Sequence, residues 1–165
     1  MSNIYLEAYK FVTSPTMLGV EDEHKAKKFA DAYAQTCNTP GRLSQKFYDD
    51  AYDVAYSTSK LNMDDEIHCK RFVADYALSC HPASLITEQV YSQIDDFARN
   101  VSMMNLDDFE ARKFIYKFLL ECGWENYLTE NNWNKTYNYA VNDLNKGPTD
   151  AEEFTRQFFA EFKPL

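Results

Sequence analysis

A pattern of nineteen residues occurs three times in this chain, and a shortened copy lies near its C-terminal end. A phenylalanine shared by the four copies recurs after 43, 42 and 44 residues. A fixed period in this range is typical of helical repeat arrays, so it constrains the fold more than any single motif. The copies span Gly19–Cys37, Asn62–Cys80, Met104–Cys122 and Pro148–Phe162.

Each copy of the pattern predicts one helix, here called helix B. Aromatic residues recur at i and i+4, as in Phe72 and Tyr76, which places one apolar stripe on the helix. Acidic residues fill the first turns, where they complement the helix dipole, and Thr149 with Glu152 fits a capping box. The predicted B helices lie near Val20–Cys37, Asp64–Cys80, Leu106–Cys122 and Asp150–Phe162. The residues expected in the core are Phe29, Phe72, Phe114 and Phe158.

A second pattern, helix A, precedes each helix B with nearly the same period. Its copies share a large aromatic residue and, seven positions later, a small apolar residue. One helix of such a pair cannot bury its apolar stripe alone, so stacked pairs would make a continuous core. The copies are Ile4–Val12, Phe47–Ala55, Val90–Ala98 and Asn132–Ala140.

The sequence therefore predicts an all-α fold of four tandem helical hairpins, with eight helices in a single domain over residues 1–165. The repeat units are expected at approximately 1–40, 41–83, 84–125 and 126–165. A unit of about 43 residues is similar in length to HEAT and armadillo units, and this similarity is one of architecture only.

Charge and cysteine usage narrow the possible functions. The net charge of −9 disfavours direct binding of nucleic acid or of an anionic membrane. No apolar run has the length of a membrane span, and Met1–Val12 lacks the basic start of a signal peptide. One repeat position holds a cysteine in three copies: Cys37, Cys80 and Cys122. Stacking of the repeats could bring these side chains close together, although a need for a small apolar core residue explains the recurrence more simply. We therefore expect reduced thiols and a cytoplasmic protein.

The excess of tyrosine is the first functional indication, with 12 Tyr beside 12 Phe. Tyrosine is common where proteins meet, and it is equally suited to the outer boundary of a core, with its hydroxyl in water. The leading hypothesis is a non-enzymatic adaptor or inhibitor that binds another protein through a surface on the A helices. The candidate residues are Tyr5, Tyr9, Tyr48, Tyr52, Tyr91 and Trp133.

The acidic first turns support an alternative hypothesis. Carboxylates repeated along one edge could imitate the phosphates of DNA and occupy a basic cleft, so the chain would be a decoy that inhibits a nucleic-acid-binding protein. The same acids also match the helix dipole and are interleaved with bases, which favours a structural role. The residues concerned are Glu21, Asp22, Glu23, Asp64, Asp65, Glu66, Asp107 and Asp108.

Basic residues recur on every B helix and could grip an acidic partner. Each stands four positions after an acid, however, which is the favourable order for an ion pair within a helix. The sequence therefore predicts the pairs Glu23–Lys27, Glu66–Lys70, Asp108–Arg112 and Glu152–Arg156.

A helical metal-binding bundle or enzyme is the third hypothesis. His24, His68 and His81 do not share a repeat position, and no Cys-x-x-Cys pair is present. No nucleophile motif or phosphate-binding glycine loop occurs either. We therefore predict no catalytic residue, no metal and no cofactor, and the sequence identifies neither the partner protein nor the oligomeric state.

Overall fold

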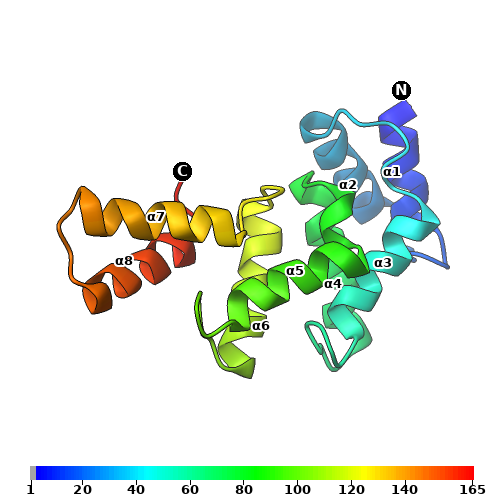
Figure 1. Ribbon diagram of the computed structural model, residues 1–165. Helices are drawn as coiled ribbons and strands as arrows, with labels where there is room; N and C mark the ends of the chain where they lie inside the picture. The colour runs from blue at the N-terminus through cyan, green and yellow to red at the C-terminus, as the bar shows by residue number, and fades with distance from the viewer. Residues whose placement is uncertain (1–2) are drawn as a thin grey trace. The chain divides into compact units, whose positions relative to one another are not determined.

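The computed structural model describes residues 3–165, and all regular structure within this range is helical (Figure 1). A 3-10 turn, η1 (Ala83–Ile86), precedes the fifth α-helix, and a π-helical turn, η2 (Phe118–Cys122), continues the sixth. The predicted all-α fold is confirmed, because every expected A and B helix is present. The α-helices are α1 (Asn3–Thr13), α2 (Glu23–Thr36), α3 (Gln45–Tyr56), α4 (Glu66–Ser79), α5 (Glu88–Arg99), α6 (Asp108–Lys117), α7 (Glu130–Asn142) and α8 (Pro148–Ala160).

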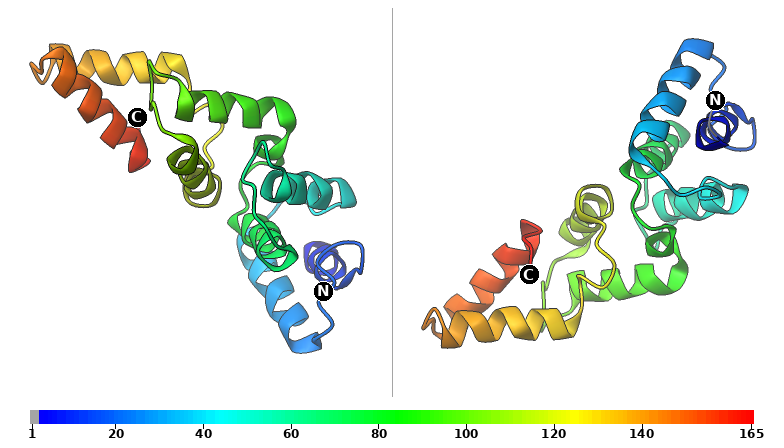
Figure 2. Two further views of the ribbon diagram at one scale, coloured as in Figure 1. Left: turned by 90° about the horizontal axis from the view of Figure 1, so that it is seen from below. Right: turned by 90° about the horizontal axis from the view of Figure 1, so that it is seen from above.

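The helices pair in chain order into four hairpins. α1 packs on α2, α3 on α4, α5 on α6 and α7 on α8, and we number these hairpins 1 to 4 (Figures 1 and 2). The chain forms two compact units: unit 1 ends at Thr87 and contains hairpins 1 and 2, and unit 2, Glu88–Leu165, contains hairpins 3 and 4. This pairing is compatible with the predicted repeat, and the folding of both units as one domain stays a prediction.

The turn inside the hairpins gives the clearest structural repeat. In hairpin 1 the backbone N–H groups of Leu18, Gly19 and Val20 donate to carbonyl oxygens at and just past the end of α1, over 2.8 to 3.4 Å. The same three hydrogen bonds recur at Leu61–Met63 in hairpin 2 and at Met104–Leu106 in hairpin 3. The middle residue of each turn has a positive φ, which glycine and asparagine adopt most easily. These residues are Gly19 (61°), Asn62 (54°) and Asn105 (54°).

The helices α2, α4 and α6 begin later than predicted, because the turn extends past these middle residues to an aspartate that caps each helix. α2, α4 and α6 are capped by Asp22, Asp65 and Asp107, whose carboxylates accept backbone N–H groups at 3.1, 2.7 and 2.9 Å. The capping box predicted at Thr149 is wrong. α8 already begins at Pro148, which suits a first helical position because it lacks an N–H, so Thr149 lies inside the helix.

The buried face of each B helix lies close to the predicted apolar stripe but is rotated slightly around the helix axis. Phe72 and Phe114 are buried as expected, whereas Phe29 and Phe158 are only half-buried. The residue that follows the shared phenylalanine is fully buried in every hairpin, so the stripe is centred one position later than predicted. These buried residues are Ala30, Val73, Ile115 and Phe159.

Neighbouring hairpins within a unit stack through an equivalent aromatic contact. In unit 1 the ring of Phe11 meets the edge of Tyr48 at 6.0 Å between centroids, with an interplanar angle of 66°. In unit 2 the ring of Phe97 meets Trp133 at 5.9 Å and 76°. T-shaped pairs of this kind stabilise a core beyond the area that they bury.

Candidate functional site

A row of tyrosines along α3 is the first candidate surface. Tyr48, Tyr52 and Tyr56 follow one another at helical spacing, and their rings stack with centroid distances of 5.8 and 6.0 Å. Exposure rises along the row, from 7% at Tyr48 through half-buried Tyr52 to 58% at Tyr56. α1 carries a shorter version, in which half-buried Tyr5 and Tyr9 stack at 6.4 Å. We call Tyr5, Tyr9, Tyr52 and Tyr56 the tyrosine surface.

Each B helix carries one of the predicted ion pairs, and those of α2 and α4 lie near these tyrosines. All four predicted pairs occur, with N···O distances between 3.0 and 3.6 Å. The carboxylate of Glu23 raises the pKa of Lys27, and Tyr5 and Tyr9 add to that effect. Burial raises the pKa of Tyr48 to about 12 and raises the pKa of Tyr52 as well. The phenols of Tyr48 and Tyr52 therefore stay neutral at physiological pH, and that of half-buried Tyr52 can donate a hydrogen bond to a partner.

Three of the six aromatic residues proposed for partner binding do not lie on the surface. Tyr48, Tyr91 and Trp133 are 7%, 2% and 4% exposed. Tyr48 and Trp133 pack against the preceding hairpin of their unit, through Phe11 and Phe97 respectively. The structure thus leaves Tyr5, Tyr9 and Tyr52 accessible and adds Tyr56. The sequence analysis missed Tyr56, although its position four residues after Tyr52 is a readable signal.

The predicted acidic residues are exposed, and most have a local partner. Asp22, Asp65 and Asp107 cap their helices, and Glu23, Glu66 and Asp108 form the ion pairs just described. The backbone N–H of His68 lowers the pKa of Asp65. Hydrogen bonds from Arg99 and then Arg112 lower the pKa of Asp108. These contacts give six of the eight acids a structural role.

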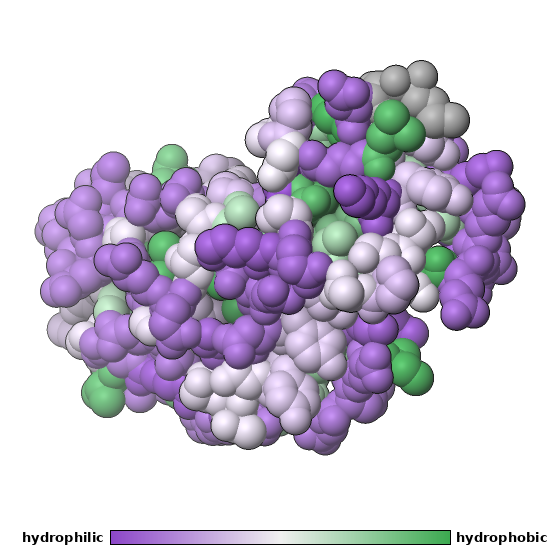
Figure 3. Space-filling model, turned by 90° about the vertical axis from the view of Figure 1, so that its right-hand side faces the viewer, coloured by the Kyte–Doolittle hydropathy of each residue, from purple (hydrophilic) through white to green (hydrophobic). Residues whose placement is uncertain are grey.

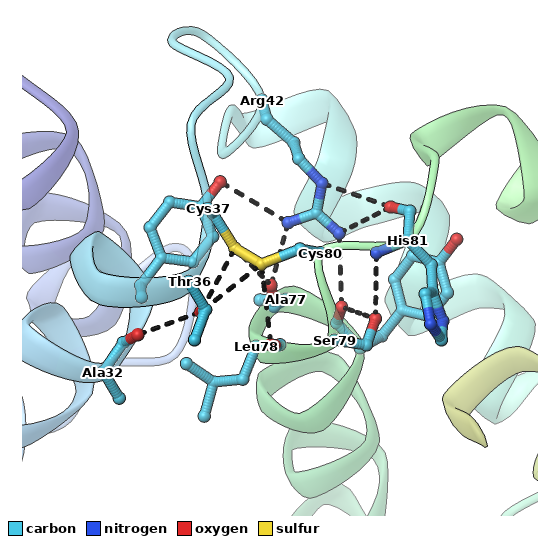
Figure 4. Close-up of a disulfide and its surroundings, with 11 residues drawn as sticks. Ala32, Thr36, Cys37, Arg42, Ala77, Leu78, Ser79, Cys80 and His81 are labelled. Carbon is cyan, nitrogen blue, oxygen red and sulfur yellow. Dashed lines mark hydrogen bonds between the residues drawn. A yellow bond between two sulfur atoms is a disulfide. The ribbon is translucent and has the colours of Figure 1, made fainter. Parts of the chain in front are cut away.

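Cys37 and Cys80 form a disulfide, which Figure 4 shows at the ends of α2 and α4. The two residues are the C-caps of these helices, and their Cα atoms are 5.6 Å apart, a usual disulfide separation. The expectation of reduced thiols is therefore wrong for this pair, because stacking of hairpins 1 and 2 brings the shared repeat position together. Cys69 and Cys122 are free and buried, and burial raises the pKa of both thiols. Raised pKa values make these two thiols poor nucleophiles.

Arg42 lies beside the disulfide, and its side chain caps the C-terminal end of α4 (Figure 4). Its guanidinium donates to the carbonyl oxygens of Ala77 at 2.9 Å, Tyr76 at 3.2 Å and His81 at 2.8 Å. It also lies 4.7 Å from the centroid of the Phe47 ring. Carbonyls at a helix end have no partner within the helix, so Arg42 supplies one. The sequence analysis missed this role, because the other linkers carry no equivalent cation.

Within residues 3–165, no group of three or more His, Cys, Asp or Glu side chains is arranged to hold a metal ion. None of the helices in the same range is long and apolar enough to cross a membrane. Figure 3 shows hydrophilic residues over most of the face it presents, with hydrophobic residues in small separate groups. Comparison of the chain with protein-family models, curated proteins and solved structures finds no match.

Proposed function

We propose that this protein is not an enzyme and that it binds another protein through the tyrosine surface of hairpins 1 and 2. The observation that carries the proposal is the stacked row on α3, which runs from the buried ring of Tyr48 to Tyr56 in solvent. The net negative charge of the chain disfavours binding of nucleic acid, which favours a protein as the partner.

The stacked rings suit this role for a physical reason. Tyr52 is held between Tyr48 and Tyr56, so its ring is ordered before a partner arrives. An ordered tyrosine offers a large contact area at a low entropy cost, with a hydroxyl for hydrogen bonding. The Glu23–Lys27 and Glu66–Lys70 pairs beside the rings would form the polar rim that such interfaces have.

The test begins with capture of a partner from host lysate and measurement of its affinity for the full chain. We expect Tyr52→Ala and Tyr56→Ala to weaken binding by roughly tenfold each, with little dependence on salt. The control is Phe109→Ala, which truncates an exposed aromatic residue of unit 2, 72% exposed, that takes part in neither proposed surface. Binding that survives both α3 changes would contradict the proposal.

The same measurement evaluates the acidic decoy, which stays the second candidate because all eight predicted acids are exposed. A decoy would lose binding when Asp64 and Glu66 are both changed to Lys. Its affinity would also fall steeply with salt, because exposed charges are screened. That outcome, together with intact binding of the Tyr52 and Tyr56 variants, would replace the leading proposal.

We also propose a cytoplasmic location, which requires that the Cys37–Cys80 pair be mostly reduced in the cell. Disulfides persist in oxidising compartments and are rare in the cytosol. A cytoplasmic protein would therefore hold Cys37 and Cys80 mostly as thiols. Differential alkylation in intact cells, followed by mass spectrometry, measures the oxidised fraction of this pair. A pair found fully oxidised would contradict the cytoplasmic location.

A further inference from the structure

Residues of α1 form the face of hairpin 1 that contacts hairpin 2, which we call the receiving face. Besides the contact between Phe11 and Tyr48, the carboxylate of Glu7 accepts the backbone N–H groups of Gly41 and Leu43, at 2.6 and 3.1 Å. These two residues lie in the linker that leads into α3. The receiving face of a hairpin is therefore built from its A helix, with an aromatic ring at the position of Phe11.

Hairpin 4 carries an aromatic ring at the same position, and there the ring is exposed. Tyr139 stands at the repeat position of Phe11 and Phe97, which are 0% and 1% exposed, yet Tyr139 is 49% exposed. Lys135 and Phe158 stand at the positions of Glu7 and Phe29. A groove of about 360 Å³ lies over this face, whereas a cavity of roughly 150 Å³ already holds a benzene ring. The groove is lined by Lys135, Thr136, Tyr139, Phe158, Pro164 and Leu165.

The complementary half of the contact is on α1. Ile4 and Tyr5 stand at the repeat positions of Phe47 and Tyr48, the two residues of α3 that pack against Phe11. Phe47 and Tyr48 are 3% and 7% exposed after docking, whereas Ile4 and Tyr5 are only half-buried. The chain therefore has partly exposed residues at both positions that form the contact between hairpins 1 and 2.

We propose that α1 of a second copy of this chain docks into the groove of hairpin 4, so that copies associate head to tail. The argument is continuity with the interface seen between hairpins 1 and 2 and between hairpins 3 and 4. Lys135 has no carboxylate, so the docked contact would rest on the apolar residues of the groove and would lack the hydrogen bonds that Glu7 accepts. The two faces differ, so the contact is heterologous and generates rings or open chains rather than a symmetric dimer.

The experiment is sedimentation velocity on the full chain over a wide range of concentration. The wild type should grow beyond a dimer as concentration rises. Tyr139→Asp and Ile4→Asp should each weaken association by roughly tenfold or more, because each buries a carboxylate in an apolar contact. Tyr139→Ala removes the ring without adding charge and should weaken association in the same direction.

Two substitutions serve as matched controls. Val101→Asp places a carboxylate at a residue of unit 2 that is 75% exposed and outside the groove. Leu6→Asp does so on α1, where Leu6 is 51% exposed. The residues at the repeat position of Leu6 are polar, so this position lies outside the stacking contact. They are Asp49, Ser92 and Asn134.

A mixing experiment gives the sharpest outcome. The Ile4→Asp variant keeps its groove, and the Tyr139→Asp variant keeps its α1, so an equimolar mixture should form a one-to-one complex and nothing larger. Thermal melts establish that each variant is folded. A wild type that stays monomeric at every concentration, or a mixture that forms no complex, would overturn the proposal. The Tyr52→Ala variant should self-associate as the wild type does, which separates this proposal from the proposed partner binding.

Discussion

The linker between the hairpins reaches the end of the following B helix in both units, with different chemistry. In unit 1 the guanidinium of Arg42 donates to three carbonyl oxygens at the end of α4. In unit 2 the residue at the same repeat position is Tyr127, whose hydroxyl donates to the carbonyl oxygen of Lys163 at 2.6 Å, just beyond α8. Arg42 is half-buried, and Tyr127 is 3% exposed. The comparison indicates that the fold requires a donor at this place rather than a particular side chain.

The contact between hairpins shows the same contrast. Unit 1 joins the ends of α2 and α4 through the Cys37–Cys80 disulfide. Unit 2 has Cys122 at the equivalent position without a disulfide, so aromatic rings pack its interface with no cross-link, whereas unit 1 combines ring contacts with the disulfide. Burial of large rings and a covalent cross-link stabilise a fold by different means, because the first lowers the energy of the folded state and the second restricts the unfolded chain. The rings concerned are Phe97, Tyr127, Trp133 and Phe159.

The largest expected effect is on the aromatic interface of unit 2. Phe159 is fully buried and contacts Phe97 at 5.1 Å, Tyr127 at 5.2 Å and Trp133 at 5.8 Å between ring centroids. We expect Phe159→Ala to lower the free energy of unfolding by about 3–5 kcal/mol, the usual cost of truncating a buried aromatic residue. Urea denaturation measures the change, and an unchanged midpoint would show that these rings do not hold unit 2 together. The matched change in unit 1 is Val73→Ala, which removes less volume and should cost less.

The next largest effect is expected for the cross-link of unit 1. The disulfide closes a loop with a sequence separation of 43 residues. Replacing both Cys37 and Cys80 by Ala should lower stability by about 2–4 kcal/mol, and adding a reductant to the wild type should have a similar effect. Cys122→Ala in unit 2 breaks no cross-link and provides the control. Equal sensitivity of the wild type and the double variant to reductant would contradict the assignment.

Removing the hydrogen-bond donors of the two linkers, Arg42 and Tyr127, should lower the free energy of unfolding by a smaller amount. Arg42→Met keeps an aliphatic stem and removes the hydrogen bonds to the end of α4, and we expect a loss of about 1.5–3 kcal/mol, as for bonds from a charged group. Tyr127→Phe removes one neutral hydrogen bond and should cost about 1 kcal/mol. Chemical denaturation of both variants tests the order. A larger loss at Tyr127 would mean that unit 2 depends on this donor more than unit 1 does.

Most of the fold could be predicted from the sequence, because repetition places eight helices without any knowledge of their packing. The ion pairs were also readable, since a spacing of four residues fixes their geometry. The ends of the turns were not predicted: Asn62 and Asn105 adopt a positive φ, and each turn runs on to the aspartate cap of the next helix. The candidate surface was predictable only in part. Helical periodicity places a tyrosine at the edge of a stripe, but the depth of Tyr48 or Tyr91 depends on the neighbouring hairpin.

The disulfide could not be deduced from the cysteines alone. Cys37, Cys80 and Cys122 share a repeat position, so any neighbouring pair satisfied the sequence equally well. The structure selects Cys37 and Cys80 because hairpins 1 and 2 stack within one unit and bring the ends of α2 and α4 together. The groove of hairpin 4 could not be predicted from the sequence either, because it depends on which hairpin leaves its receiving face uncovered in the folded protein.

The smallest expected effect is an acid dependence of stability that comes from Asp65, the cap of α4, and from Asp108, an ion-paired residue in the first turn of α6. The N–H of His68 lowers the pKa of Asp65 in unit 1, and the guanidiniums of Arg99 and Arg112 lower the pKa of Asp108 in unit 2. A pKa lowered by folding means that the ionised carboxylate stabilises the folded state. This stabilisation is complete above the ordinary pKa of an aspartate and is lost as the pH falls through the lowered folded value.

Thermal melts at neutral and acid pH should therefore show a smaller loss of Tm on acidification for Asp65→Asn and Asp108→Asn than for the wild type. Asparagine still caps α4 at position 65, so that variant should remain close to the wild type at neutral pH. At position 108 the same change removes the charge that Arg99 and Arg112 share, so stability should already fall at neutral pH. The control is Asp64→Asn, which removes a carboxylate that does not cap α4. If all three variants lose stability on acidification as the wild type does, capping by Asp65 and ion pairing by Asp108 contribute nothing measurable to the stability of either unit.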